Sequence, residues 1–225
     1  MTDEVVLNAP LFAALSPQSA QELAGAMTSL KLNRGQVLFE EGEPGDRLYV
    51  IGSGKIKVGR TSSDGRENLL TVLGGGDVLG ELSLFDPGPR TATATAVSSS
   101  VVYELTHERL TELLATDPSV ASYLLQALAH RLRRTNEALA DLVFSDVPGR
   151  VAKALLDLSA RFGQDTPEGL VVAHDLTQEE LAHLVGASRE TVNKALADFA
   201  ARGWVRRAGR AIVLLDVARL ERRSR

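Results

Sequence analysis

The chain has 225 residues, of which 44% are hydrophobic and 24% are charged, a composition typical of a globular protein with one large or two modest domains. It contains no cysteine, which excludes disulfides, thiolate metal sites, iron–sulfur clusters and cysteine nucleophiles. No segment approaches the roughly 20 apolar residues that cross a bilayer, and the first ten residues, MTDEVVLNAP, lack the basic and apolar regions of a signal peptide. We therefore expect a cytoplasmic protein without a membrane partner.

Charge is divided unevenly along the chain. Residues 1–146 hold 12 lysines and arginines against 19 aspartates and glutamates, a net charge of −7, whereas residues 147–225 hold 13 against 10, a net charge of +3. Such a division is typical of a two-part protein whose second part faces a polyanion. Chance variation in solvated charge explains the same numbers equally well.

Glycine marks the first part of the chain as β-rich. Twelve of the 19 glycines lie between Gly35 and Gly88, among short β-prone runs such as QVLFEEG and NLLTVLGGG. Short strands separated by turn glycines predict an antiparallel barrel or sandwich. We expect a helix starting near Ser16 before this region, and after it a last β segment, residues 92–106, followed by a helix near His107.

A long helix is predicted between Pro118 and about Asp146, because no proline or glycine interrupts this stretch. Its apolar residues recur at steps of three and four, a heptad seam that favours a two-stranded coiled coil and hence a homodimer. The alternative is an amphipathic helix packed on its own domain. Thr135, which is followed by Asn136, stands where the seam expects a leucine. A polar residue in this seam either sets the pairing register or binds a polar ligand. The seam leucines are Leu125, Leu128, Leu132, Leu139 and Leu142.

The stretch FSDVPGR, residues 144–150, ends the long helix and predicts a domain boundary and hinge. A helix through VAKALLDLSARFG follows, and we take RFGQDTPEGL as a surface loop. Two further helix starts come next: Thr177 and Glu180 form a capping box, and Ser188 is a good N-cap. Gly186 lies in the tight turn between them, which is the helix-turn-helix pattern.

The second helix of this motif begins with polar side chains that would enter the major groove of DNA. Arginine pairs with guanine through two hydrogen bonds, and glutamate accepts one from cytosine N4. The segment GWVRRAGRAIVLLD resembles a β-hairpin wing whose Arg206, Arg207 and Arg210 could reach phosphates. An ordinary helical hairpin with a solvated charged face is the alternative. We predict DNA binding through Thr177, Gln178, Ser188, Arg189, Glu190, Thr191 and Lys194.

The stretch GELSLFDPGPRT keeps a carboxylate, Glu81, and a guanidinium, Arg90, around a small apolar core. With GEPGDRLYVIGSGKIKV, RRTN, FSDVPGRVA and LTQEELAHLVGASRETVNKAL, it resembles the cyclic AMP receptor protein (CRP/FNR) family of transcription regulators, particularly the actinobacterial branch. The resemblance runs from about Leu11 to the C-terminus. It implies an α+β fold with a jelly-roll-like, cyclic-nucleotide-binding β-roll (1–117), a dimerisation helix and hinge (118–146) and a C-terminal winged helix-turn-helix (147–225).

The same resemblance implies a site for cyclic AMP as the effector. Glu81 would hold the ribose 2′-hydroxyl, Arg90 would neutralise the cyclic phosphate, and Thr135 would bond the adenine amino group. Asn136, where the family commonly has serine, would reach the nucleotide bound in the other subunit. An ion pair between Glu81 and Arg90 across the loop is the alternative that needs no ligand. The expected ligand-binding residues are Gly80, Glu81, Leu82, Ser83, Arg90, Thr91, Thr135 and Asn136.

The implied function is that of a cyclic-AMP-responsive homodimer that binds an inverted repeat of TGTGA-like half-sites in double-stranded DNA and contacts RNA polymerase. The stretch RFGQDTPEGL is either a surface that contacts the polymerase or a plain surface loop. Arg189 and Glu190 match the family residues that read the half-site, whereas Lys194 stands where arginine is common and lacks its bidentate geometry. A regulator of the same family that is ligand-independent, or responds to another nucleotide such as cyclic GMP, is the main alternative.

An enzyme acting on a nucleotide is a remote alternative. The histidines His107, His130, His174 and His183 are scattered, without metal-ligand spacing or the arrangement that activates a nucleophile. We therefore expect neither enzymatic activity nor a metal site.

Overall fold

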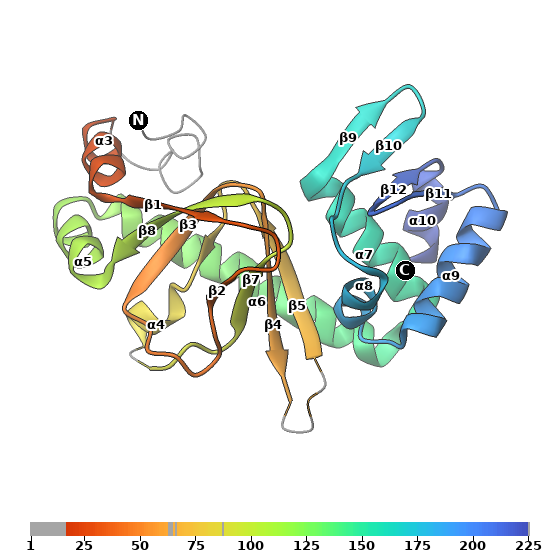
Figure 1. The fold of residues 1–225 in the computed structure, drawn as a ribbon, viewed down its shortest axis with the longest axis horizontal. Coiled ribbons are helices and arrows are strands. Elements are labelled where there is room, and N and C mark those ends of the chain that lie inside the picture. The colour runs from red at the N-terminus through yellow and green to blue at the C-terminus, as the bar shows by residue number, and fades with distance from the viewer. Residues whose placement is uncertain (1–16, 63–64, 66, 87, 225) are drawn as a thin grey trace. The chain divides into compact units, whose positions relative to one another are not determined.

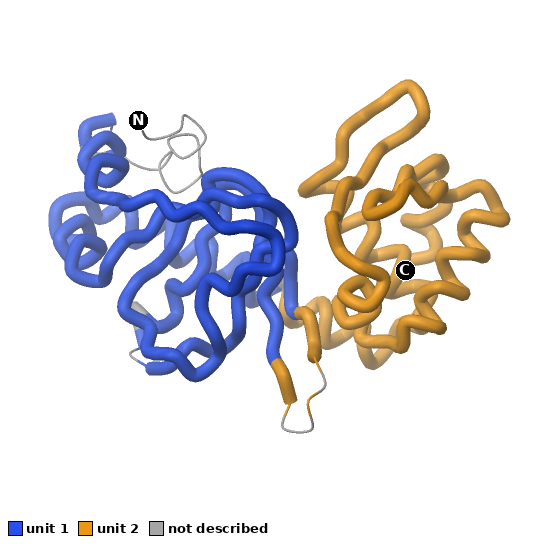
Figure 2. Tube along the Cα trace, viewed as in Figure 1, with its two compact units in different colours: residues 1–60, 70–133 blue, residues 61–69, 134–225 orange. Residues whose placement is uncertain are grey.

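The structure is a computed structural model that describes residues 17–62, 65, 67–86 and 88–224. The chain forms two compact units, coloured separately in Figure 2. The first comprises residues 1–60 and 70–133, and the second comprises residues 61–69 and 134–225. The start of the family resemblance near Leu11, and Ser16, near which a helix was expected to begin, lie outside the described residues.

The first unit is built on two four-stranded sheets (Figure 1), whose described pairings are antiparallel. One sheet has the strand order β1-β8-β3-β6 and the other β2-β7-β4-β5. Ile51 of the first sheet and Ile56 of the second belong to the same buried cluster, so the sheets face each other as a jelly-roll-like β-roll. The strands are β1 Thr28–Leu32, β2 Val37–Phe39, β3 Arg47–Ser53, β4 Lys55–Thr61, β5 Glu67–Gly74, β6 Val78–Leu79, β7 Thr93–Ala96 and β8 Ser100–Thr106.

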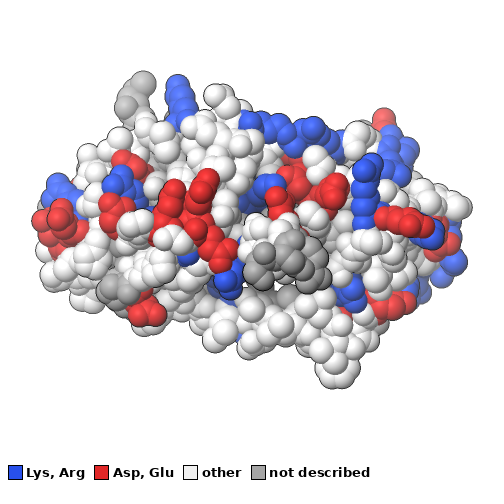
Figure 3. Space-filling model, turned by 60° about the horizontal axis from the view of Figure 1, so that its bottom comes forward, with Lys and Arg blue, Asp and Glu red and all other residues white. Residues whose placement is uncertain are grey.

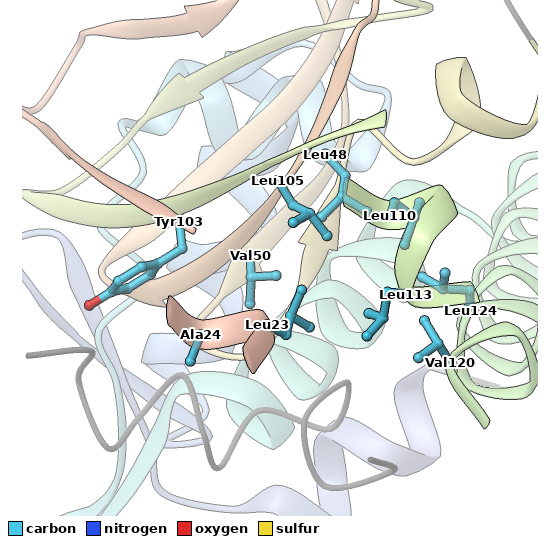
Figure 4. Packing of buried hydrophobic residues seen from close by; sticks show 10 residues of the cluster. All are labelled: Leu23, Ala24, Leu48, Val50, Tyr103, Leu105, Leu110, Leu113, Val120 and Leu124. Atoms are coloured by element: carbon cyan, nitrogen blue, oxygen red, sulfur yellow. The ribbon is translucent and has the colours of Figure 1, made fainter. Parts of the chain in front are cut away.

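Helices cover the other face of the first sheet. They are α3 (Pro17–Ala26), α5 (His107–Thr116) and the first turns of α6 (Ser119–Phe144). Figure 4 shows a second core cluster in which side chains of these helices pack on β3 and β8. Its members are Leu23, Ala24, Leu48, Val50, Tyr103, Leu105, Leu110, Leu113, Val120 and Leu124. The predicted helices near Ser16 and His107 are thereby confirmed, and the expected last β segment is two strands, β7 and β8.

The long helix α6 runs without interruption for 26 residues. Most of the predicted seam leucines are exposed in the chain, and Leu128 is half-buried. More than half of the surface of each exposed leucine is therefore uncovered in the single chain. These are Leu125, Leu132, Leu139 and Leu142, exposed by 67%, 62%, 58% and 52%.

The helix break predicted at residues 144–150 is confirmed, because two residues, Ser145 and Asp146, separate the end of α6 from the start of α7 (Val147–Phe162). Asp146 caps α7 by accepting a hydrogen bond from the Gly149 N–H at 2.9 Å, and Pro148 occupies the first turn, where its missing N–H costs nothing. Asp146 also forms an ion pair with Arg223 at 2.5 Å. The pKa of Asp146 lies below its usual range, chiefly because Arg223 donates a hydrogen bond to it and next because Gly149 does.

The second unit contains the predicted winged helix-turn-helix. Its sheet has the order β11-β12-β10-β9, α7 packs against β9 and β10 of this sheet, and the remaining helices of the unit contact α7. The capping box at Thr177 and Glu180, the N-cap at Ser188 and the wing hairpin are all confirmed. The elements are β9 Gly163–Thr166, β10 Gly169–Val172, α8 Gln178–Val185, α9 Arg189–Ala201, β11 Val205–Ala208, β12 Ala211–Leu214 and α10 Val217–Arg223.

Two elements of this unit differ from the expectation. The stretch taken as a surface loop is the hairpin β9–β10, and β10 pairs with wing strand β12, so it belongs to the sheet. The helix α10 was not predicted, because most of its residues are charged and only Leu220 is buried. Among the described residues, no helix is long and apolar enough to span a bilayer.

We predict that Asp146→Ala lowers the free energy of unfolding by about 1 kcal/mol at neutral pH, because it removes the N-cap of α7 and the partner of Arg223. A carboxylate whose pKa is lowered by folding stabilises the native state above its unfolded pKa of about 3.9, and this contribution is lost as the pH falls through the lower native pKa. The difference from wild type should therefore shrink below about pH 4.

Urea unfolding at about pH 7, 5 and 3 measures this difference. Asp165→Ala removes an exposed carboxylate of β9 and serves as the control. A difference between Asp146→Ala and wild type that stays constant down to about pH 3 would contradict the electrostatic account.

Candidate functional site

The segment Gly80–Thr91 joins β6 to β7 and contains a short helix, α4 (Leu82–Phe85). Gly80, at its start, has a φ of +82°, which side-chain-bearing residues rarely adopt. A Cβ at this position would lie 2.6 Å from Nη1 of Arg90. Glycine is therefore required both by the backbone conformation and by the approach of the arginine.

This segment lines a pocket in the first unit. Its floor is formed by apolar residues of the two sheets, and its polar groups come from the segment itself and from α6. Among the predicted ligand residues, the structure brings together Gly80, Glu81, Leu82, Ser83, Arg90 and Thr91. The remaining lining residues are Phe39, Val58, Leu79, Ala92 and Arg131.

Arg90 is a buried cation, only 4% exposed. Its Nη1 donates to the Gly80 carbonyl oxygen at 3.0 Å and its Nη2 to the Arg47 carbonyl oxygen at 2.8 Å. Its guanidinium carbon lies 4.4 Å from the ring centroid of Phe39. Its Nε is buried without a hydrogen-bond partner, and no carboxylate of the described residues forms an ion pair with it. The pocket thus holds a positive charge that no anion of the described chain neutralises.

Glu81 is also only 4% exposed, and its partner is not Arg90, with which the sequence alternative paired it. Its Oε1 accepts a hydrogen bond from Nη1 of Arg131 at 2.7 Å, and its Oε2 is buried without a hydrogen-bond partner. Between the described Glu81 and Arg90 no ion pair is formed. The carboxylate therefore joins the segment to α6, and one of its oxygens is available to accept from a bound hydroxyl.

A second charged cluster supports the loop beside Arg90. Arg47 donates two hydrogen bonds to Asp46, at 2.8 and 2.7 Å, and one to Glu104 at 3.1 Å. The pKa of Asp46 lies below its usual range, first because Arg47 donates to it and to a smaller extent because of the charge of Arg90. These contacts fix the backbone of Arg47, whose carbonyl oxygen accepts from Arg90.

Gly45 sets the position of Ser83. A Cβ on Gly45 would lie 2.1 Å from Cβ and 2.3 Å from Oγ of Ser83, which no pair of side chains tolerates. Ser83 is buried and lines the pocket, and it lies on α4. The absence of a side chain at Gly45 therefore allows α4 to pack close to the loop before β3.

Thr135 and Asn136 lie on α6, four and five residues beyond Arg131, and both are exposed. They belong to the part of the helix assigned to the second unit. Their predicted contacts with a nucleotide remain a prediction.

The polar residues at the start of α9, the second helix of the helix-turn-helix, lie at the surface. Gly186 ends α8 in the left-handed conformation, with a φ of +65° and a ψ of +46°, and its N–H bonds back to the His183 carbonyl oxygen. Ser188 caps α9, accepting from the Thr191 N–H at 3.2 Å. Val192 is fully buried and anchors the helix. The exposed residues of the predicted DNA-binding set are Thr177, Ser188, Arg189, Glu190, Thr191 and Lys194, and Gln178 is half-buried.

Several predicted DNA-contacting side chains pair with their neighbours. Lys194 forms an ion pair with Glu190 at 2.8 Å, one turn away on α9. On the wing, Arg206 pairs with Glu168 and Arg207 donates to Asn193, whereas Arg210 lies exposed at the turn beside Gly209. Figure 3 shows acidic and basic side chains next to one another on the face that it draws.

Sequence reasoning missed Arg131 as a member of the pocket. The signal available was its spacing, four residues before Thr135 on the same helix, which places the two on one side of α6. No group of three or more histidine, aspartate or glutamate residues suited to a metal ion occurs in the described part of the chain.

Comparisons with known proteins agree with this arrangement. A family model of the cyclic nucleotide-binding domain matches residues 29–117, and one of the Crp-like helix-turn-helix domain matches residues 149–223. The chain is 53% identical over 223 residues to the CRP-like cAMP-activated global transcriptional regulator of Mycobacterium tuberculosis, covering 99% of this chain and 100% of the relative. It is 35% identical to the cyclic AMP receptor protein of Thermus thermophilus, covering 94% and 95%.

Solved structures support the same fold. A CRP-family transcriptional regulator of Thermus thermophilus superposes with a TM-score of 0.74 at 29% identity, covering 87% of this chain and 96% of that one. The Thermus thermophilus catabolite activator protein matches with a TM-score of 0.55 at 34% identity, covering 96% and 98%.

The contact between Gly45 and Ser83 generates a prediction. Gly45→Ala should lower the affinity for a cyclic nucleotide on the order of tenfold, because the new methyl group displaces Ser83 and α4. The same substitution made in a Ser83→Gly background should cost at most about twofold, because the overlapping atoms are gone. Calorimetric titration of wild type, both single variants and the double variant measures this coupling. An equal cost of Gly45→Ala in both backgrounds would contradict it.

Proposed function

The chain belongs to the cyclic AMP receptor protein family of transcription regulators, and on that premise we propose that it is a homodimeric regulator whose DNA binding responds to cyclic AMP. The proposal rests chiefly on one observation: the buried guanidinium of Arg90 faces a pocket without an anionic partner in the described chain. Burying an unpaired charge destabilises a protein by several kcal/mol, on the order of the cost of breaking a buried ion pair. A cyclic phosphate would supply the missing negative charge.

The other groups of the pocket suit the rest of a nucleoside cyclic phosphate. Oε2 of Glu81 lacks a hydrogen-bond partner among the described residues and could accept from the ribose 2′-hydroxyl. Arg131 holds the other oxygen of this carboxylate and so fixes its orientation. Ser83 and Thr91 line the same pocket and could donate to phosphate oxygens.

Adenine is favoured over guanine by Thr135, whose hydroxyl can accept from the adenine amino group. This preference is weak, since a hydroxyl also donates to the guanine carbonyl oxygen. A regulator that responds to cyclic GMP, or to no nucleotide, is the alternative, and titration with both nucleotides distinguishes it. The relative from Mycobacterium tuberculosis is described as cAMP-activated, which supports the adenine nucleotide here.

The exposed stripe on α6 supports a dimer. Leucines separated by heptad spacing lie uncovered in the single chain, and a second copy would cover them with the same stripe. A two-fold dimer presents two copies of α9, so the target DNA would be an inverted repeat, for which we propose TGTGA-like half-sites read by Arg189 and Glu190. RNA polymerase is the proposed protein partner, by family membership.

We predict that wild type binds cyclic AMP with micromolar or tighter affinity and that Arg90→Gln weakens this affinity at least about a hundredfold. The substitution removes the positive charge that faces the ligand, and charge-assisted hydrogen bonds contribute about 1.5 to 3 kcal/mol each. Calorimetric titration with cyclic AMP and cyclic GMP measures both affinities, and Arg60→Gln on β4, which pairs with Glu41 at the surface, is the matched control.

Equal affinity in Arg90→Gln and wild type would refute the pocket assignment. Tighter binding of cyclic GMP than of cyclic AMP would favour the alternative effector. Binding of neither nucleotide by wild type would leave only the DNA-binding part of the proposal.

We predict that Leu132→Asp converts the dimer into monomers, because a carboxylate would be buried in the apolar seam. Sedimentation equilibrium measures the mass in solution. Gln126→Asp introduces the same side chain at an exposed position of α6 outside the seam and should leave the dimer intact. A dimeric Leu132→Asp protein would place the interface elsewhere.

A further inference from the structure

Arg150, the fourth residue of α7, donates three hydrogen bonds to main-chain carbonyl oxygens. Its Nη1 donates to Ser145 at 2.7 Å, its Nε to Val185 at 3.0 Å and its Nη2 to Gly186 at 3.3 Å. Arg150 is half-buried, and no acid of the described chain forms an ion pair with it. All three hydrogen bonds of the guanidinium are therefore directed at backbone.

The three acceptors belong to two helix ends. Ser145 directly follows the last residue of α6, Val185 is the last residue of α8, and Gly186 is its C-cap. The last carbonyl oxygens of a helix lack partners within it and carry partial negative charge, which a cation offsets. One guanidinium thus caps the C-terminal ends of α6 and α8 together. The planar fork of arginine permits this, whereas the compact ammonium of lysine does not.

The α8–α9 turn, to which Arg150 donates, leads directly into α9, the helix predicted to enter the major groove of DNA. Only Ala187 separates the Gly186 carbonyl oxygen from Ser188, the N-cap of α9, and Arg189 follows. Fixing this turn therefore fixes the point at which α9 begins. A shift of about 1 Å at such a point is enough to disrupt paired hydrogen bonds to a base edge.

Two further contacts join the same elements. A Cβ on Gly186 would lie 3.1 Å from Cδ2 of Leu142, so the last turn of α6 packs against the turn of the helix-turn-helix. Lys153 of α7 forms a half-buried ion pair with Asp141 of α6 at 2.5 Å. Three contacts thus connect the end of α6, the start of α7 and the α8–α9 turn. Among these contacts of the described residues, only that of Arg150 reaches all three segments.

We infer that Arg150 is a positioning residue for DNA recognition: it fixes the start of α9 to the end of α6 through backbone carbonyl oxygens and does not itself contact DNA. This inference rests on the proposed DNA-binding function. It predicts a loss of sequence selectivity without a loss of the electrostatic attraction to DNA. A phosphate-contacting arginine would behave in the opposite way, because its removal weakens binding to all sequences and reduces the salt dependence.

The test uses the full-length chain with cyclic AMP present. Wild-type protein first selects a preferred sequence from a random duplex pool. Fluorescence anisotropy then measures the affinity for that duplex and for a scrambled duplex of equal length, at three salt concentrations. The variants are Arg150→Gln, Arg150→Lys and, as the matched control, Arg161→Gln at the other end of α7. Circular dichroism melting checks that each variant is folded.

We expect Arg150→Gln to bind the selected duplex on the order of tenfold more weakly, the equivalent of about one charge-assisted hydrogen bond. Its affinity for the scrambled duplex should change less than about twofold, with an unchanged salt slope. Arg150→Lys should lie between wild type and Arg150→Gln, which keeps the inference testable if the glutamine variant does not fold. Arg161→Gln should match wild type.

Two results would overturn the inference. One is full wild-type selectivity in both Arg150 variants. The other is an equal loss on both duplexes with a salt slope smaller by about one, which would make Arg150 a phosphate contact. If the wild-type protein selects no sequence, the proposed reading of DNA sequence is wrong, and this inference with it. If the wild-type protein is selective and the variants stay equally selective, only the inference is wrong.

Discussion

The buried guanidinium of Arg90 is the constraint on which the pocket depends. A desolvated cation is tolerated only when polar groups surround it, and here two carbonyl oxygens and the face of Phe39 do so. Each of these neighbours imposes a requirement on the sequence. Position 80 must be glycine, since any Cβ would occupy the space of the guanidinium. The backbone of Arg47 must be fixed, which its hydrogen bonds to Asp46 and Glu104 achieve.

Of the two buried charges of the pocket, one has a partner of opposite charge and the other does not, and this difference determines what can bind. The carboxylate of Glu81 is already paired with Arg131, so its charge is neutralised, but one oxygen still lacks a hydrogen-bond donor among the described residues. The guanidinium of Arg90 has backbone acceptors but no counter-charge in the same part of the chain. The pocket therefore favours a ligand that brings one negative charge toward Arg90 and one neutral donor toward Glu81. A cyclic phosphate on a ribose with a free 2′-hydroxyl has both groups.

The parts of this arrangement that local chemistry determines could be predicted from the sequence. The capping box at Thr177, the turn at Gly186 and the N-cap at Ser188 are local features, and the structure has all three. Contacts between distant segments could not be predicted in this way. Arg131 meets Glu81 across 50 residues, and Arg150 meets Val185 across 35, and neither pair has a periodic pattern. The hairpin β9–β10 was missed because GQDT has little β propensity and is a strand through pairing with β10, which joins the wing sheet.

The helix α6 is the element through which a ligand could influence DNA reading. Arg131, near its middle, holds the carboxylate of the pocket, and Leu142, about three turns later, packs against Gly186. A ligand shifts a conformational equilibrium only by the difference between its free energies of binding to the two states. A nucleotide that donates to Oε2 of Glu81 would share this carboxylate with Arg131, whose hydrogen bond to Oε1 joins α6 to the pocket. Within the second unit, Arg150 donates to carbonyl oxygens at the end of α6 and at the turn before α9, so these two points are held together by one side chain.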